Sequence, residues 1–150
     1  MSSDSNGISL GATHLASILK DVFAPWVQDL NLAIEGVAED MVTTRMPADA
    51  RLSRVGGIVS GQAMSAMADT TMVLALAKRL GGFRPVATID LSMSFMRAVK
   101  SSDVLCEARV RRAGRSLAFV CAELRAAEDQ EVAAVANGTF AVPDKGASTS

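Results

Sequence analysis

One long apolar segment, residues 60–79, constrains the possible folds of this chain more than any other feature. Its sequence, SGQAMSAMADTTMVLALAKR, carries a single charged side chain, Asp69, before its last turn. Ser60 is a suitable N-cap, and Lys78 and Arg79 lie where a helix dipole favours cations. A helix this apolar must be covered on nearly all sides. One sheet face covers only part of a helix, so either the sheet curls around it or a second subunit helps to bury it.

The N-terminal part of the chain predicts one helix followed by two strands. Residues 14–28 place apolar side chains at helical spacing, and Pro25 should bend or end this helix. Residues 31–36 and 38–47 favour two strands, with Gly36 at the turn between them. A polar and then glycine-rich stretch follows, which is typical of a loop.

After the long helix, the polarity of the sequence alternates with period two, which predicts a strand in VATIDLSMSF (86–95). The two rows are Thr88, Asp90, Ser92 and Ser94, facing one way, and Ile89, Leu91, Met93 and Phe95, facing the other. The segments DVLCEARVRR, RSLAFVCAELRA and EVAAVANGTFAV predict three more strands in an antiparallel meander. The predicted class is therefore α+β.

A two-residue turn at Ala113 and Gly114 would place Cys106 opposite Cys121 on neighbouring strands. Reduced thiols in the core are the favoured interpretation of this pair.

Composition and charge exclude several classes of function. We expect a single domain over residues 1–150, with 1–12 and 144–150 as flexible tails. The formal net charge of −1 offers no general attraction for nucleic acid or an anionic membrane. No apolar run reaches transmembrane length without a charge, and no secretion signal precedes the first helix, so we expect a cytoplasmic protein. With one histidine and no Cys/His cluster, neither a metal nor a cofactor is expected.

Four segments in order carry a resemblance to a known family. They are VGGIVSGQAMSAMADTTMVLAL, TIDLSMSFMRAV, RRAGRSLAFVCAEL and VAAVANGTF, which together cover about residues 50–142. In their order and spacing they resemble the hotdog-fold acyl-CoA thioesterases of the phenylacetate-pathway type. The resemblance implies a long central helix wrapped by a curved antiparallel sheet, with an extra N-terminal helix here. It also implies homodimers joined edge to edge, often paired into dimers of dimers, that hydrolyse an acyl-CoA thioester.

The resemblance also assigns site residues by position. Asp69 matches the catalytic acid of the family, and Gly61 matches the glycine whose backbone N–H polarises the thioester carbonyl. The histidine of the family is Ser60 in this chain, and its second glycine is Gln62. The amide residue often found six positions before that histidine is Arg54.

The chemistry of hydrolysis fits these assignments only if two chains cooperate. A carboxylate can act as general base or as nucleophile, and an N–H at a helix start can stabilise an oxyanion. Gly61 and Asp69 are eight positions apart, roughly 12 Å along one helix. One carbonyl cannot touch both, so we expect two composite sites in a two-fold dimer. Asp69 could instead cap a backbone group or pair with an arginine, and the chain could bind acyl-CoA without hydrolysing it.

Other residues carry weaker expectations. Thr70 or Thr71 could hydrogen-bond Asp69 or orient water, or bond back to the helix. Ser60 is mainly a cap, Gln62 could lie at the site mouth, and Arg54 could hold a carbonyl, a water or a pantetheine amide. Cations that cluster at strand ends could grip the phosphates of coenzyme A or simply be solvated; they are Arg97, Lys100, Arg111, Arg112 and Arg115.

Overall fold

The computed structural model describes residues 11–144, so most of the two predicted tails lie outside the described residues. Two short helices open the chain, α1 (Ala12–Asp21) and α2 (Pro25–Gln28). The strands β2 (Ala33–Ala38) and β3 (Met41–Met46), the 3-10 turn η1 (Ala50–Leu52) and the short strands β4 (Ser53–Arg54) and β5 (Ile58–Val59) follow. The long helix α3 (Gly61–Leu80) then precedes β6 (Ala87–Phe95), β7 (Val104–Ala113), β8 (Leu117–Ala126) and β9 (Val132–Ala141).

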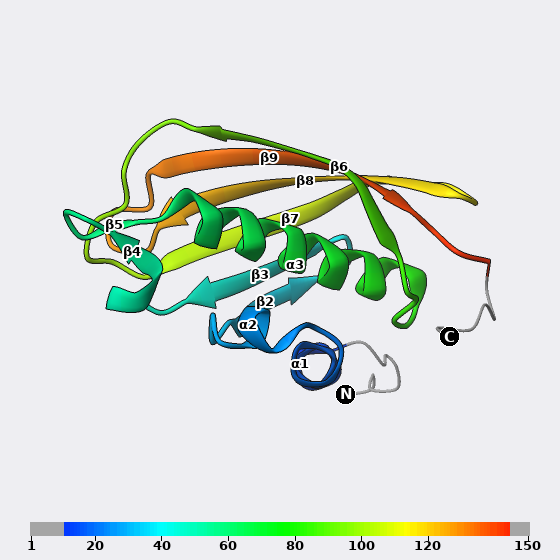
Figure 1. The fold of residues 1–150 in the computed structure, drawn as a ribbon. Helices are drawn as coiled ribbons and strands as arrows, with labels where there is room; N and C mark the ends of the chain where they lie inside the picture. Colours follow the sequence, from blue (N-terminus) through cyan, green and yellow to red (C-terminus); the bar gives the residue numbers. More distant parts are fainter. Residues whose placement is uncertain (1–10, 145–150) are drawn as a thin grey trace.

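Within residues 11–144, the main sheet has six strands in the order β2-β3-β7-β8-β9-β6, and every neighbouring pair is antiparallel. Figure 1 shows that α3 runs along one face of this sheet and that α1 and α2 lie beside β2. The central helix wrapped by an antiparallel sheet is confirmed. The strands β2 and β6 form the two edges of the sheet.

The helix α3 begins and ends where its sequence predicts. The side chain of Ser60 accepts a hydrogen bond from the Ala63 N–H at 3.1 Å, which satisfies one free donor of the first turn. Gly81 ends the helix in the left-handed conformation at φ +79°. The side chains that α3 buries completely include Met67, Met72, Leu74 and Leu76.

The N-terminal elements differ from their predicted bounds. The single helix expected over 14–28 is broken, because α1 ends at Asp21 and Pro25 starts α2, where its missing N–H costs nothing. The turn between β2 and β3 is formed by Glu39 and Asp40 instead of Gly36. Gly36 lies within β2, at a shift in the pairing register.

The predicted pairing of the two cysteines is wrong. Ala113 pairs with Ala118, so the β7–β8 turn is longer than two residues, and β7 shifts register once more between Val110 and Arg112. Cys106 therefore lies opposite Leu124, and Cys121 lies opposite Arg109.

Burial raises the pKa of the Cys106 thiol to about 12. A thiolate nucleophile at this position is thus unavailable near neutral pH.

The edge strand β6 contains a bulge that changes which side chains face α3. Thr88 pairs with the fully buried Phe140, whereas Asp90 pairs with Thr139, so Ile89 is an extra residue on this strand. One extra residue moves the preceding side chain to the opposite face. Thr88 therefore shares the inner face with Leu91, and Ile89 is 57% exposed. The simple alternation predicted for this strand is wrong at these two residues.

Candidate functional site

The lone charge on α3, Asp69, is half-buried and hydrogen-bonded to the neighbouring edge strand. The Thr88 hydroxyl donates to Asp69 Oδ1 at 3.0 Å. The bulge at Ile89 makes this contact possible, because it turns Thr88 toward α3. No lysine or arginine among residues 11–144 forms an ion pair with Asp69. The arginine-paired alternative for Asp69 is therefore excluded within the described part of the chain.

Two opposing effects act on the pKa of Asp69. Burial is the larger effect and raises the pKa, since the charged form loses contact with water. The hydrogen bond from Thr88 lowers the pKa, because it stabilises the ionised form. The net result is a raised pKa. A carboxylate of raised pKa is a stronger base than an exposed aspartate, which suits it to accept a proton from water.

Asp69 lies at a mostly apolar pocket of about 310 Å³. Three walls surround the pocket: the N-terminal helices, one face of α3, and the segment that joins α3 to β6. The lining residues are Val22, Phe23, Trp26, Val27, Ala66, Asp69, Thr70, Val73, Phe83, Val86 and Thr88. An apolar cavity with a few polar groups at one place is typical of a small-molecule site.

Gly61 lies at a second pocket, of about 350 Å³, that also contains Arg54 and Arg97. The Gly61 N–H donates to no acceptor among the described residues, as expected for the first residue of a helix. A Cβ at this position would lie 3.3 Å from Phe95 Cζ, so glycine lets the Phe95 ring pack closely against the helix start. A free N–H reinforced by the helix dipole can stabilise an oxyanion.

The predicted site residues thus form two separate groups within one chain. Asp69 and Thr70 share the first pocket, whereas Arg54, Gly61 and Arg97 share the second. The side chain of Ser60 is occupied as the α3 cap, and the side chain of Gln62 is exposed. Asp69 and Gly61, the two residues to which the resemblance assigns hydrolysis, therefore line different pockets of a single chain.

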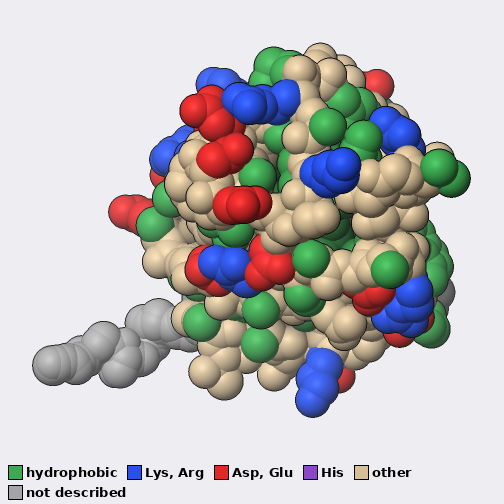
Figure 2. All heavy atoms as spheres, turned by 90° about the vertical axis from the view of Figure 1, so that its left-hand side faces the viewer, with side chains coloured by type: hydrophobic (Ala, Val, Ile, Leu, Met, Phe, Trp, Pro, Cys, Tyr) green, Lys and Arg blue, Asp and Glu red, His purple; other side chains and the backbone are tan. Residues whose placement is uncertain are grey.

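The predicted cluster of cations does not form within one chain. Arg97 and Arg115 lie at the two different ends of the sheet. Phe95, near Arg97, pairs with Ala134 at the start of β9, whereas Leu117, near Arg115, pairs with Ala141 at the end of β9. Arg97 also forms an exposed ion pair with Glu131 at 3.0 Å. Figure 2 shows basic and acidic side chains intermingled on the face at the β4–β5 end.

The two threonines that follow Asp69 have different roles. The Thr71 hydroxyl donates to the Met67 carbonyl at 2.7 Å and lies 2.8 Å from the hydroxyl of Thr44. Thr71 therefore bonds back to its own helix, while Thr70 lines the pocket of Asp69. The residue that contacts the acid is Thr88, which sequence reasoning missed, because its expected alternation ignored the bulge.

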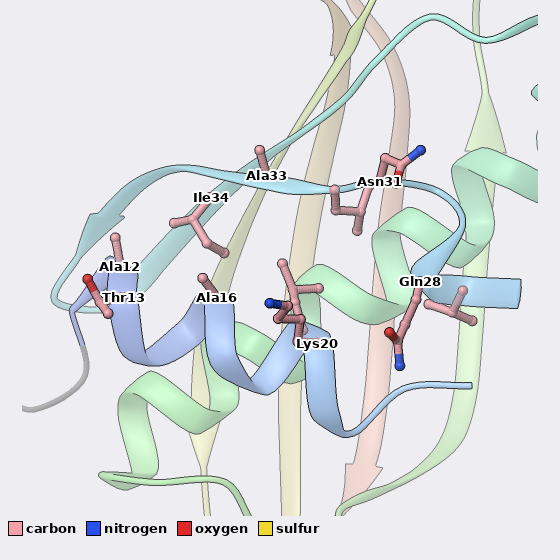
Figure 3. A pocket seen from close by; sticks show the side chains of 11 residues that line it. Ala12, Thr13, Ala16, Lys20, Gln28, Asn31, Ala33 and Ile34 are labelled. Atoms are coloured by element: carbon pink, nitrogen blue, oxygen red, sulfur yellow. The ribbon is translucent and has the colours of Figure 1, made fainter. Parts of the chain in front are cut away.

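A larger pocket, of about 550 Å³, lies between α1 and β2. Figure 3 shows Ile34 of β2 pointing toward α1, where Ala12 and Ala16 lie, whereas Ala33 points away from α1; Thr13, Lys20, Gln28 and Asn31 are the other labelled lining residues. None of the residues that line it is a carboxylate, histidine or cysteine. This pocket therefore lacks a group that could activate water.

Two structural features are absent from residues 11–144. None of the helices there combines the length and hydropathy that a bilayer crossing demands. Across the same residues, histidine, cysteine, aspartate and glutamate side chains do not gather in groups of three that could hold a metal ion.

Comparisons with known proteins agree with the architecture. A proposed thioesterase from Silicibacter sp. TM1040 is 31% identical, with a TM-score of 0.77 over 88% of this chain and 91% of that one. A thioesterase from Haemophilus influenzae is 22% identical, with a TM-score of 0.83 over 95% and 96% of the two chains. A phenylacetic acid degradation-related protein from Ralstonia eutropha, also proposed to be a thioesterase, is 24% identical, with a TM-score of 0.74 over 86% and 99%.

The expected hotdog fold of a long helix wrapped by an antiparallel sheet is thereby confirmed. The family model for the thioesterase superfamily matches residues 56–133, which is more than half of the 150 residues. The matched region includes both Gly61 and Asp69. The chain belongs to the thioesterase superfamily.

Proposed function

We propose that this protein hydrolyses an acyl-CoA thioester to the free acid and coenzyme A. The observation that carries the proposal is the half-buried Asp69, held by Thr88 at an apolar pocket and free of any ion pair among the described residues. An unpaired carboxylate in such a place costs folding free energy, so its presence there favours a functional role, and here it faces the space where an acyl group would bind. Asp69 acts either as general base toward water or as nucleophile toward the acyl carbon.

The oxyanion donor is the N–H of Gly61 in a second copy of the chain. Within one copy the two groups are roughly 12 Å apart along α3. A two-fold axis that sets two α3 helices antiparallel would bring Gly61 of each copy to Asp69 of the other. The strand β6 offers the surface for this pairing, because it forms an edge of the sheet and exposes Phe95 to 52%. A homodimer, further paired into a dimer of dimers, would thus hold composite sites.

The same arrangement places cations near the coenzyme. Arg54 and Arg97 share the pocket of Gly61, and Gln62 is exposed at the helix start beside it. Pairing two copies in antiparallel orientation also brings the end of the sheet that carries Arg115 in one copy toward the end that carries Arg97 in the other copy. Guanidinium groups there would grip the phosphates of coenzyme A.

The first test measures free thiol release from a panel of acyl-CoA thioesters. Replacing Asp69 with alanine should lower kcat/KM by about 10²–10⁴-fold, the usual contribution of a general base. Asp40→Asn is a matched control, because Asp40 lies in the β2–β3 turn, where it pairs with the exposed Arg79. Binding of acyl-CoA by the unaltered protein without thiol release would instead favour a non-catalytic acyl-CoA-binding protein.

The second test asks whether two chains share each site. Asp69→Asn and Gly61→Pro homodimers should both be inactive, since proline removes the N–H at a position where helices accept it. Gly61→Ala is the matched control, because it adds the same Cβ near Phe95 but keeps the N–H. Mixing the two inactive chains should restore about one working site in each heterodimer. Sites confined to single chains would give no recovery.

A further inference from the structure

One wall of the Asp69 pocket comes from the N-terminal helices and the link between them, which precede the segment matched by the superfamily model. The match begins at residue 56, whereas Phe23 lies between α1 and α2, and Trp26 and Val27 lie in α2. The break between these helices lets two large aromatic side chains reach the same pocket as the carboxylate. This wall is therefore formed by residues that the superfamily model does not match.

The two aromatic residues occupy different depths of the wall. Phe23 is partly buried and packs against the core, whereas Trp26 is 62% exposed. An indole exposed to this extent contributes little to the core, yet it lines an apolar cavity. Aromatic side chains offer large, rigid surfaces for apolar ligands. The position of Trp26 is therefore explained better by a ligand than by folding.

The dimensions of the pocket restrict that ligand. Its volume of about 310 Å³ lies at the small end of the range for ligand sites, about 300–1,000 Å³. Apart from Asp69, Thr70 and Thr88, the lining of the pocket is apolar. This apolar part of the lining offers no partner for a charged or strongly polar group.

We infer that Phe23 and Trp26 form the acyl-selecting wall of the site, which takes a compact apolar acyl group and disfavours a long fatty acyl chain. This inference rests on the proposed function and identifies which acyl groups that function accepts. An acyl chain longer than the pocket would have to extend out of it into water. A shorter one would leave the aromatic surface uncovered.

Trp26 also provides a binding test that does not require turnover, because it is the only tryptophan in the chain. The Asp69→Asn protein would be titrated with hexanoyl-CoA, with palmitoyl-CoA below its micelle concentration, and with free CoA. We expect the indole emission to shift to the blue with hexanoyl-CoA, more weakly with palmitoyl-CoA, and not with free CoA. An emission spectrum that does not change with hexanoyl-CoA would overturn the inference, even if hydrolysis occurs.

The kinetic test compares kcat/KM for straight-chain acyl-CoA thioesters from acetyl to palmitoyl. Trp26→Ala and Phe23→Leu should each raise the ratio of palmitoyl to hexanoyl turnover by about tenfold or more, because one methylene of misfit is worth about 10–200-fold in a hydrophobic pocket. Phe119→Ala is the matched control, since Phe119 is a partly exposed aromatic on β8 outside this pocket. Thermal melts would verify that the Phe23→Leu protein is folded.

The outcomes separate the two proposals. No thiol release from any thioester by the unaltered protein would contradict the proposed hydrolysis, while the fluorescence titration would still report on the pocket. Hydrolysis with the same chain-length profile in the unaltered, Trp26→Ala and Phe23→Leu proteins would contradict the acyl-selecting wall and leave hydrolysis standing.

Discussion

Gly138 lies where β9 passes closest to α3, and we expect its replacement by alanine to destabilise the protein. A Cβ at this position would lie 2.8 Å from Met72 Sδ and 2.9 Å from Phe140 Cε1. Unstrained contacts between non-bonded heavy atoms are about 3.5–4.0 Å. Both neighbours are completely buried, so neither side chain can swing into solvent to make room. The helix and the strand must therefore move apart, or the Phe140 ring must shift.

The magnitude follows from two opposing contributions. Overpacking of a core costs about 1–3 kcal/mol, whereas the loss of backbone freedom in the unfolded chain returns about 0.4–1 kcal/mol. The net loss of unfolding free energy should be about 1–2 kcal/mol. For a chain of this size each kcal/mol corresponds to about 2–4 °C, so the melting temperature should fall by roughly 2–8 °C.

Thermal unfolding followed by circular dichroism would measure this loss, with Gly36→Ala as the control. A Cβ on Gly36 would lie 3.8 Å from Thr43 Cβ, an ordinary contact, so its melting temperature should hold or rise slightly. In a Met72→Ala background, Gly138→Ala should cost less, because the crowded sulfur is gone. The reasoning would be refuted if the melting temperature of Gly138→Ala were equal to or above that of the unaltered protein, or if the melting temperature of Gly36→Ala fell by as much as that of Gly138→Ala.

Two further predictions concern the carboxylate. Replacing Thr88 with valine removes the hydrogen bond that lowers the pKa of Asp69, so the acid limb of the pH profile of kcat/KM should move to higher pH. Thr88→Ser keeps a hydroxyl and should leave the acid limb in place. An acid limb that does not move in the valine variant would contradict a role of Thr88 in positioning the acid. Because folding raises the pKa of Asp69, the folded protein loses stability relative to the unfolded chain as pH rises through that pKa, and Asp69→Asn escapes this loss. The melting temperature of Asp69→Asn should therefore match that of the unaltered protein below the ordinary aspartate pKa of about 3.9, exceed it by a growing amount as pH rises to the folded pKa, and keep a constant lead above that. A difference in melting temperature between the two proteins that is the same at every pH would contradict this linkage.

Local signals in the sequence predicted the central helix and singled out Asp69 as its candidate acid. The cap at Ser60 and the glycine stop at Gly81 act within one turn of the helix, so neighbouring residues suffice to predict them. Asp69 stands out for a similar reason, because it is the one charge before the last turn of a helix that must be buried. The alternation along the strands likewise indicated an antiparallel sheet without reference to any distant contact.

Tertiary structure decided how these elements meet. The bulge at Ile89 and the longer β7–β8 turn depend on which residues pair across the sheet, and pairing is set by packing between segments far apart in sequence. The bulge alone turned Thr88 toward Asp69 and so completed the contact that sequence reasoning missed. The N-terminal helices likewise reached the Asp69 pocket only through packing, because nothing local to Phe23 or Trp26 specifies that neighbour. Helices and caps are thus encoded by adjacent residues, whereas registers and pocket walls arise from contacts that exist only in the folded chain.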